Sequence, residues 1–322
     1  RKLSLDQNYM MTMVRKVTNS GTEPVVLHPY GLISRWGTPH VQGFYVLHEG
    51  PIGVLGEKLQ ELSYANLQEK EHSFASRGGW MGIGDKYWLV ALVPQQDREL
   101  QATFRASQQG GQIRYQVDYL ENPVTIAPGA TVELTDRIFG GAKEAKLLDQ
   151  YATDLNVPLF DRAVDFGWFP YLTKPMFYVL HFFNGLVGNY GIAILLLTLC
   201  VKAIFFPLAD KSYRAMAKMK ALQPAMTALR EKHGDDKVKM NQELMALYKK
   251  EKVNSLAGCL PIMLQIPVFF ALYKVLFVSI EMRHAPFYGW IHDLSAPDPT
   301  TLFNLFGLIP WTPPHFLMIG IW

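Results

Sequence analysis

The stretch GIAILLLTLCVKAIFFPL, residues 191–208, decides the fold, because it is nearly all apolar and holds a single full charge, Lys202. As an α-helix it would extend roughly 27 Å, which is close to the hydrocarbon thickness of a bilayer. We therefore predict a transmembrane helix over residues 189–209. Lys202 lies within it, and a charge that faces lipid costs several kcal/mol. The lysine either snorkels to the headgroups along its flexible stem or faces a wet cavity between helices.

Average composition hides how unevenly the chain is built. Of 322 residues, 49% are hydrophobic and 18% are charged, but the long apolar blocks all lie in the second half. The net charge of +3 argues against general nucleic-acid binding, so no specific nucleic-acid sequence is expected as a partner. Cys200 and Cys259 fall in apolar blocks, with no disulfide or metal spacing. The chain begins without Met and stops inside an apolar run, so we expect a piece of a longer protein that lacks both ends.

Residues 1–141 are predicted to form an antiparallel β-sandwich. Short runs rich in Val, Tyr, Phe, Thr and Ile alternate with turn signals, and no helical pattern intervenes. The glycine-rich GGWMGIG, residues 78–84, lacks phosphate-loop spacing and is interpreted as a turn. Exposed Trp and Tyr could form a sugar-binding face, although such residues are more often core or edge residues. No reactive constellation stands out, so we expect no enzyme, no catalytic residue, no metal and no cofactor.

A helical connector is predicted over residues 142–174, followed by an amphipathic helix over residues 175–188. Thr173 is a candidate N-cap, and Pro175 suits a first helical turn. The apolar stripe of this helix comprises Met176, Leu180, Phe183 and Val187. A helix in the membrane interface fits this pattern, and a core helix of the sandwich fits almost as well.

The region 210–254 is basic, with eleven Lys or Arg against five acidic residues in its part 211–252. Such an excess between apolar blocks marks the cytoplasmic side of a membrane. Its apolar spacing predicts two antiparallel helices, 211–233 and 235–252, that are separated at Gly234. Pro224 should kink the first helix, for which the sequence offers no reason. The hairpin is either a solvated loop or a docking arm for RNA, anionic lipid or a partner protein.

A second transmembrane helix is predicted over residues 258–281. Gln265 lies between two prolines in its cytoplasmic half, so this face should pack on protein or line water. Lys274 lies toward the far end and is expected to snorkel. The loop 282–313 follows on the other side of the membrane, with Trp290 as its interfacial anchor, and a further span begins at 314–322.

Taken together, these segments resemble the YidC-type bacterial membrane protein insertases, in the Gram-negative form with a large periplasmic domain. The resemblance covers essentially the whole chain. Five stretches carry it: YGIAILLLTLCVKAIFFPL (190–208), KMKALQPAMTALREKHGDDKVKMNQELMALYKKEKVNSLAGCLPIMLQIPVFFALY (218–273), APFYGWIHDLSAPDP (285–299), DRIFGGAKEAKLLDQY (136–151) and GGWMGIGDKYWLVALVP (78–94).

The resemblance implies a multi-pass protein of the cell inner membrane that acts as an insertase and chaperone in protein transport and translocation. Residues 1–188 would be periplasmic, with 1–141 the latter part of a β-supersandwich, and the hairpin 210–254 would be cytoplasmic. An α-helical transmembrane core would enclose a hydrophilic groove that contains Lys202, Thr198 and Gln265. The family usually has arginine at position 202, so lysine keeps the charge but not the two-pronged fork.

The partners implied by the resemblance are nascent membrane proteins, the ribosome, the Sec translocon, the signal recognition particle receptor and the phospholipid bilayer. The cytoplasmic hairpin would receive them. Its candidate docking side chains are Lys218, Lys220, Arg230, Asp235, Asp236 and Lys249.

Two other classes of function fit parts of the sequence. A transporter or channel subunit could use Lys202 and Gln265 to line a solute path, although the helix breaks typical of both halves of a transporter are not visible. Alternatively, the β domain could be the working part, a sugar-binding or enzymatic module that the spans merely anchor.

Overall fold

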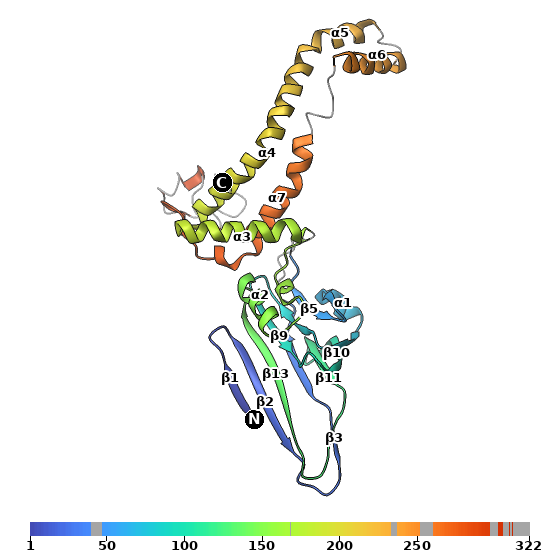
Figure 1. Ribbon diagram of the computed structural model, residues 1–322, viewed down its shortest axis with the longest axis vertical. Helices are drawn as coiled ribbons and strands as arrows, with labels where there is room; N and C mark the ends of the chain where they lie inside the picture. The colour runs from blue at the N-terminus through green and yellow to red at the C-terminus, as the bar shows by residue number, and fades with distance from the viewer. Residues whose placement is uncertain are drawn as a thin grey trace. The chain divides into compact units, whose positions relative to one another are not determined.

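The structure is a computed structural model that describes residues 1–39, 47–167, 169–232, 237–251, 260–296, 302–304, 309 and 311. It divides into two compact units (Figure 1). The first contains Arg1–Gly167 and Leu276–Arg283, and the second contains Trp168–Val275 and His284–Trp322. We call the first the β unit and the second the helical unit.

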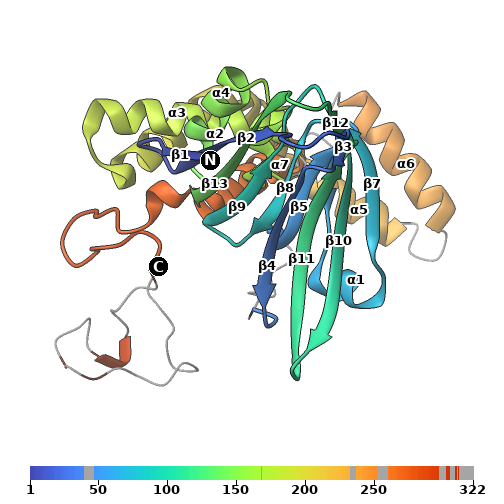
Figure 2. The ribbon, with the colours of Figure 1, turned by 90° about the horizontal axis from the view of Figure 1, so that it is seen from below.

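Antiparallel sheets form most of the β unit. One sheet has seven strands in the order β1-β2-β13-β9-β8-β5-β6, another has four in the order β4-β11-β10-β7, and β12 pairs with β3. Figure 2 shows the strands of the four-stranded sheet side by side. The strands are β1 (Lys2–Leu5), β2 (Met10–Thr18), β3 (Val25–Leu27), β4 (Tyr30–Trp36), β5 (Gly50–Leu55), β6 (Lys58–Glu61), β7 (His72–Arg77), β8 (Trp80–Gly84), β9 (Trp88–Val93), β10 (Glu99–Gln109), β11 (Gln112–Glu121), β12 (Val124–Ile126) and β13 (Thr131–Ala142). The predicted antiparallel β class is confirmed.

A hydrophobic core fills the space between the two large sheets. Met81 and Leu92 contribute from the seven-stranded sheet, and Phe104, Tyr115 and Val117 contribute from the four-stranded one. Each of these side chains is at most 3% exposed. Residues two apart on β11 share the inward face, as strand geometry requires. The core therefore arises from the alternation that the sequence shows.

The glycine-rich stretch is only partly the turn that was predicted. Gly78 and Gly79 have positive φ and form a turn, but Trp80–Gly84 is the fully buried strand β8. A Cβ on Gly82 would lie 2.2 Å from the carbonyl oxygen of Val90 on the neighbouring strand. Glycine serves here for close approach between strands.

The predicted connector 142–174 is, up to Gly167, a packed part of the β unit. It contains α2 (Ala145–Asp154) and the 3₁₀ turn η1 (Phe160–Ala163). Phe160 is 0% exposed, and its ring packs edge-on against Trp80 and Phe139. The indole of Trp80 donates a hydrogen bond to the carbonyl of Pro158 at 3.2 Å. The remaining helix of this unit, α1 (Tyr64–Glu69), is capped by the Ser63 hydroxyl.

The helical unit begins with α3 (Pro170–Val187). The helix starts earlier than predicted, because Pro170 occupies the first turn. Thr173 is not the N-cap; its hydroxyl donates to the carbonyl of Phe169 at 2.9 Å from inside the helix. The stripe is buried at Met176 and Leu180, whereas Val187 is 39% exposed. Gly188, with φ of 67°, ends the helix.

The long helix α4 (Tyr190–Ala221) runs through the predicted membrane edge and on into the basic region. It ends at Leu222, and α5 (Gln223–Lys232) begins at once. Pro224 therefore lies in the first turn of a new helix, where a missing N–H is harmless, and the predicted kink inside a helix 211–233 is wrong.

A second helix of the hairpin, α6 (Lys237–Lys250), contacts α5, and the Tyr248 hydroxyl lies 3.7 Å from Met226 Sδ. Figure 1 shows both helices beyond the end of α4. Gly234, the predicted break, lies outside the described residues.

The second apolar helix is α7 (Leu260–Val278), followed by the 3₁₀ turns η3 (Ile280–Met282) and η4 (Leu302–Asn304). Among the described residues, α4 and α7 are the helices that are long and apolar enough to cross a membrane. The predicted start of a further span at 314–322 lies outside the described residues.

Candidate functional site

Thr198 and Lys202 lie one turn apart on α4, so they share one face of the helix. Lys202 is exposed, and Thr198 is half-buried. The Thr198 hydroxyl donates to the carbonyl of Ile194 at 2.8 Å, which satisfies its proton within the helix and leaves its oxygen able to accept. Within the described part of the chain, Lys202 makes no hydrogen bond or ion pair. Its charge is therefore available to a partner outside the described residues.

Gln265 lies on α7, six residues into the helix, and is half-buried. Pro267 follows in the same helix, so one backbone N–H is missing close to the glutamine. Among the described residues, no hydrogen bond joins Gln265 to Thr198 or Lys202. The structure thus places two of the three predicted groove residues together, and the role of all three stays a prediction.

Large apolar side chains surround these polar groups and face outward. On α4, Leu199 is 65% exposed and Ile204 is 74% exposed, and on α7 Phe269 and Phe270 are 59% and 65% exposed. So much apolar surface requires lipid or further protein to cover it. The side chains of Thr198, Lys202 and Gln265 are polar exceptions within the apolar stretches of these two helices.

Lys274 is the second lysine in the spans, and its predicted snorkelling is wrong. The residue is 8% exposed, on a face of α7 where Ala271 and Val275 are 2% and 0% exposed.

The predicted docking side chains are only partly described. Lys218 and Lys220 are exposed in the last turn of α4, and Lys249 is exposed in the last turn of α6. Basic side chains at helix C-termini also complement the helix dipole, which is a structural reason for their placement. Arg230 lies in α5, but its side chain is not described, and Asp235 and Asp236 lie outside the described residues.

Trp290 lies in a loop that is closed by local contacts, and it is 50% exposed. The carboxylate of Asp293 accepts hydrogen bonds from the backbone N–H of His284 at 2.9 Å and from Ser295 N and Oγ at 2.8 and 2.7 Å. The Ser295 bonds chiefly, with that from His284, lower the pKa of the Asp293 carboxyl. The loop is held against α4, because a Cβ on Gly191 would lie 2.1 Å from the Phe287 ring. Trp290 is thus presented on a fixed loop.

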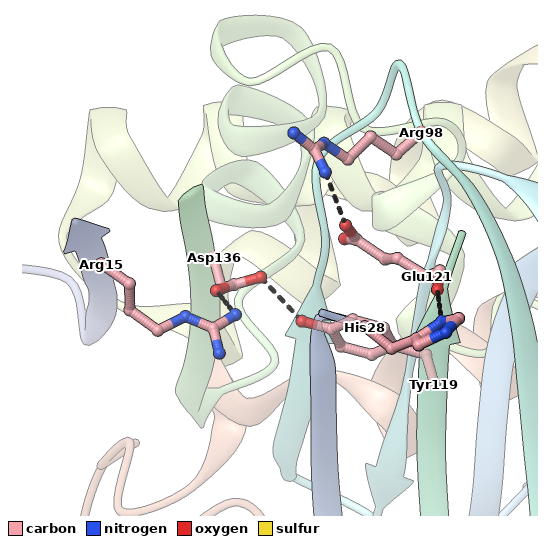
Figure 3. Close-up of polar contacts among 6 residues, drawn as sticks. All are labelled: Arg15, His28, Arg98, Tyr119, Glu121 and Asp136. Carbon is pink, nitrogen blue, oxygen red and sulfur yellow. Dashed lines mark hydrogen bonds and ion pairs between the residues drawn. The ribbon is translucent and has the colours of Figure 1, made fainter. Parts of the chain in front are cut away.

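Sequence reasoning missed a buried charged cluster in the β unit (Figure 3). Asp136 forms an ion pair with Arg15 and accepts the Tyr119 hydroxyl at 2.8 Å. Glu121 is 2% exposed, and Arg98 Nη1 lies 3.6 Å from its carboxylate. Both oxygens of that carboxylate are buried without a hydrogen bond.

Burial is the largest cause that raises the pKa of Glu121, to about 7, and Asp136 adds to the shift while Arg98 opposes it. No sequence signal distinguished this residue, because it stands at a strand end next to Asn122 and Pro123. In the described ranges, no group of three or more His, Cys, Asp or Glu side chains could hold a metal ion.

The chain matches two protein-family models, which together cover nearly all of it. Residues 1–179 match the YidC periplasmic domain family, and residues 182–319 match the 60Kd inner membrane protein family. A periplasmic β domain is thus joined to a helical inner-membrane region. The chain belongs to the YidC insertase family, as its resemblance predicted.

Curated relatives extend the similarity over the whole chain. Three proteins named membrane protein insertase YidC illustrate it. That of Methylobacterium sp. (strain 4-46) is 52% identical over 100% of this chain and 53% of its own length. Those of Nitrobacter hamburgensis and Rickettsia felis are 53% and 50% identical over 100% and 99% of this chain, and 56% and 58% of their own. The chain therefore spans about half the length of the relatives that it matches.

Among solved structures, the crystal structure of an active YidC insertase with its first transmembrane domain resolved matches 80% of this chain and 68% of that chain. The sequence identity is 17% and the TM-score is 0.37, so this likeness carries no conclusion about function.

Proposed function

We propose that this chain is part of a membrane protein insertase and chaperone that moves nascent inner-membrane proteins into the bilayer through a hydrophilic groove. The observation that carries the proposal is Lys202 on α4, a charge without a described partner inside a predicted span, one turn from Thr198. Relatives at about half identity, named membrane protein insertase, support the same activity.

The groove would work by lowering the cost of bringing polar chain into the bilayer. A hydrophilic tail of a substrate loses its hydration when it enters hydrocarbon, and unsatisfied peptide groups there are expensive. Thr198 and Gln265 would offer hydrogen-bonding groups within the predicted spans, and Lys202 and Gln265 would lie at a similar depth from the cytoplasmic side. The apolar segment of the substrate would then partition into lipid and draw the tail across. This sequence of steps needs no ATP, cofactor or covalent chemistry.

Lys202 would attract acidic residues of the translocated tail. Charges interact strongly where water is scarce, so one cation in the groove can select among substrates. Lysine provides a point charge rather than the planar fork of arginine, and bidentate contact with a carboxylate is therefore not expected.

The basic hairpin would face the cytoplasm and receive partners. Lys218, Lys220 and Lys249 are exposed on it, which suits the ribosome, the signal recognition particle receptor or anionic headgroups. Association with the Sec translocon is part of the same proposal. Residues 1–188 would lie in the periplasm, and Trp290 would anchor the loop 282–313 at the interface.

Charge reversal at position 202 tests the groove. In proteoliposomes that contain the full-length protein, Lys202→Arg should insert acidic-tailed substrates at the wild-type rate, because the charge is kept. Lys202→Glu should slow them by about tenfold, the effect of roughly 1.4 kcal/mol of repulsion. Lys211→Glu is the matched control, since it reverses a lysine on the same helix beyond the predicted span.

Wild-type insertion of acidic-tailed substrates by Lys202→Glu would contradict the groove role. Solute flux through the same vesicles without any insertion would instead favour a transporter.

A further inference from the structure

The end of the second span belongs to the β unit. Residues Leu276–Arg283, which comprise the last turn of α7 and η3, are part of that compact unit. Val278, Ser279 and Met282 are each 3% exposed. Residues buried this completely are fixed by packing, so the segment is a structural part of the unit rather than a passing linker.

The turn between β8 and β9, residues 85–87, meets this segment and is itself held firmly. Its backbone closes with a hydrogen bond from Asp85 N to Trp88 O at 2.8 Å. Three further bonds fix it from three other parts of the unit: Arg35 Nη1 to Asp85 Oδ1 at 2.5 Å, Lys86 N to Glu49 Oε1 at 2.9 Å, and Lys143 N to Tyr87 O at 2.9 Å. These four hydrogen bonds therefore fix the conformation of the turn 85–87.

Cations and aromatic rings alternate across the contact. Lys86 Nζ lies 3.9 Å from the ring centroid of Phe277 and 4.8 Å from that of Tyr87. Arg283 Cζ lies 5.9 Å from the ring centroid of Tyr87. Cations at these distances are attracted by the negative faces of aromatic rings, and the more so when they are partly desolvated, as half-buried Lys86 is.

Neither cation has a carboxylate partner that would explain its position. Within the described ranges, Lys86 and Arg283 make no ion pair. The nearby acid of the segment, Glu281, faces Glu144 and Lys146 near the start of α2 instead. The rings are thus the groups that hold both cations in place.

We propose that Lys86, Tyr87, Phe277 and Arg283 form an intramolecular clamp, through which the β domain fixes the last turn of the second span. A helix gripped by ring contacts at one end cannot turn about its own axis without breaking them. The clamp thereby holds the end of the span in place within the β unit, which we call its positioning role, and no substrate contact is assigned to it.

Amide hydrogen exchange in the full chain tests whether the clamp exists. Lys86→Met keeps the apolar stem and removes the charge, so exchange in residues 276–283 should rise about twofold to fivefold, as expected for loss of a cation–π contact. Phe277→Leu should give a similar rise, and the double variant should add little to either single one. Lys86→Arg should restore protection. The matched control is Lys58→Met, an exposed lysine on β6 of the same unit, which should leave these amides unchanged.

Wild-type protection in Lys86→Met, or simple additivity of the two single variants, would overturn the clamp. In a protein whose other six tryptophans are replaced by phenylalanine, Trp80 fluorescence reports whether each variant keeps a folded β unit, because Trp80 is 0% exposed. Loss of the native Trp80 signal in Lys86→Arg as well as Lys86→Met would show a general structural role and would also overturn it.

The positioning role rests on the proposed insertase function and has its own readout. Lys86→Met should slow insertion in proteoliposomes, while Lys86→Arg and Lys58→Met should not. Faster exchange with an unchanged insertion rate would overturn the positioning role and leave the contact standing. Failure of the wild-type protein to insert would count against the insertase function, whereas the exchange experiment would still decide the clamp.

Discussion

Glu121 places a carboxylate in the interior of the β unit with no hydrogen bond to stabilise its charge. Its pKa is raised from 4.5 to about 7 in the folded protein, because burial disfavours the charged form. A carboxyl of this kind binds its proton more tightly when the protein is folded. The stability that it contributes is therefore complete at low pH and is lost as the pH rises from about 4.5 through about 7.

Glu121→Gln should remove this pH dependence. At pH 8 we expect the free energy of unfolding of the variant to exceed that of the wild type by about 2 kcal/mol, because solvent near Arg98 screens part of the effect of burial. At pH 5 the two proteins should differ little. Thermal unfolding followed by Trp80 fluorescence across this range measures the effect. Glu133→Gln is the control, since the Glu133 side chain is 52% exposed in its pair with Lys16. Parallel pH profiles for wild type and Glu121→Gln would contradict the prediction.

At the scale of elements, α2 and η1 act as a lid on the seven-stranded sheet rather than as a connector. Phe160 joins them to Trp80 and Phe139 in one group of edge-on rings. Phe160→Ala should destabilise the β unit by about 3 to 5 kcal/mol, the range for losing a fully buried aromatic side chain. Thermal unfolding followed by Trp80 fluorescence measures this loss of stability. Leu159→Ala is the control, because Leu159 is 42% exposed. Equal melting of the two variants would show that the lid contributes no stability.

Sequence patterns within a segment predicted the strands and helices whose formation depends mainly on residues of that segment. The β class followed from short runs of β-forming residues between turn signals, and the two apolar helices followed from the length of the apolar stretches. The end of α4 did not, since only the observed break at Leu222 shows that Pro224 opens a helix. The buried strand at residues 80–84 was missed because four of the seven residues in GGWMGIG are glycines, which indicate a turn as readily as a tight strand pair.

The candidate site was predictable only along one helix. Spacing of four puts Thr198 and Lys202 on one face whatever the rest of the protein does. Which face of α7 meets them depends on packing between helices, about which spacing within a single helix says nothing. The burial of Lys274 and that of Glu121 are likewise tertiary effects, and neither has a signature in the neighbouring residues.

At the scale of the whole molecule, the basic hairpin and the β domain should lie on opposite sides of the membrane. The excess of lysine and arginine in residues 211–252, which begins within the last turns of α4, is typical of the cytoplasmic side of a membrane. In a protein with Cys200 and Cys259 replaced by serine, Asp97→Cys should react with a membrane-impermeant maleimide in intact spheroplasts. Lys250→Cys should react only after permeabilisation. Reaction of both positions in intact spheroplasts, or of Lys250→Cys alone, would refute the orientation.

The length of α4 has a further consequence. Its 32 residues extend about 48 Å, whereas a bilayer with its headgroups is roughly 40–45 Å thick. From Asp210 to Ala221 the helix continues for about 17 Å past the last apolar residues. If α4 crosses the membrane as proposed, a partner that binds α5 and α6 would meet them at a distance from the lipid surface. An emerging polypeptide could then pass sideways toward the membrane without first being released into bulk solvent.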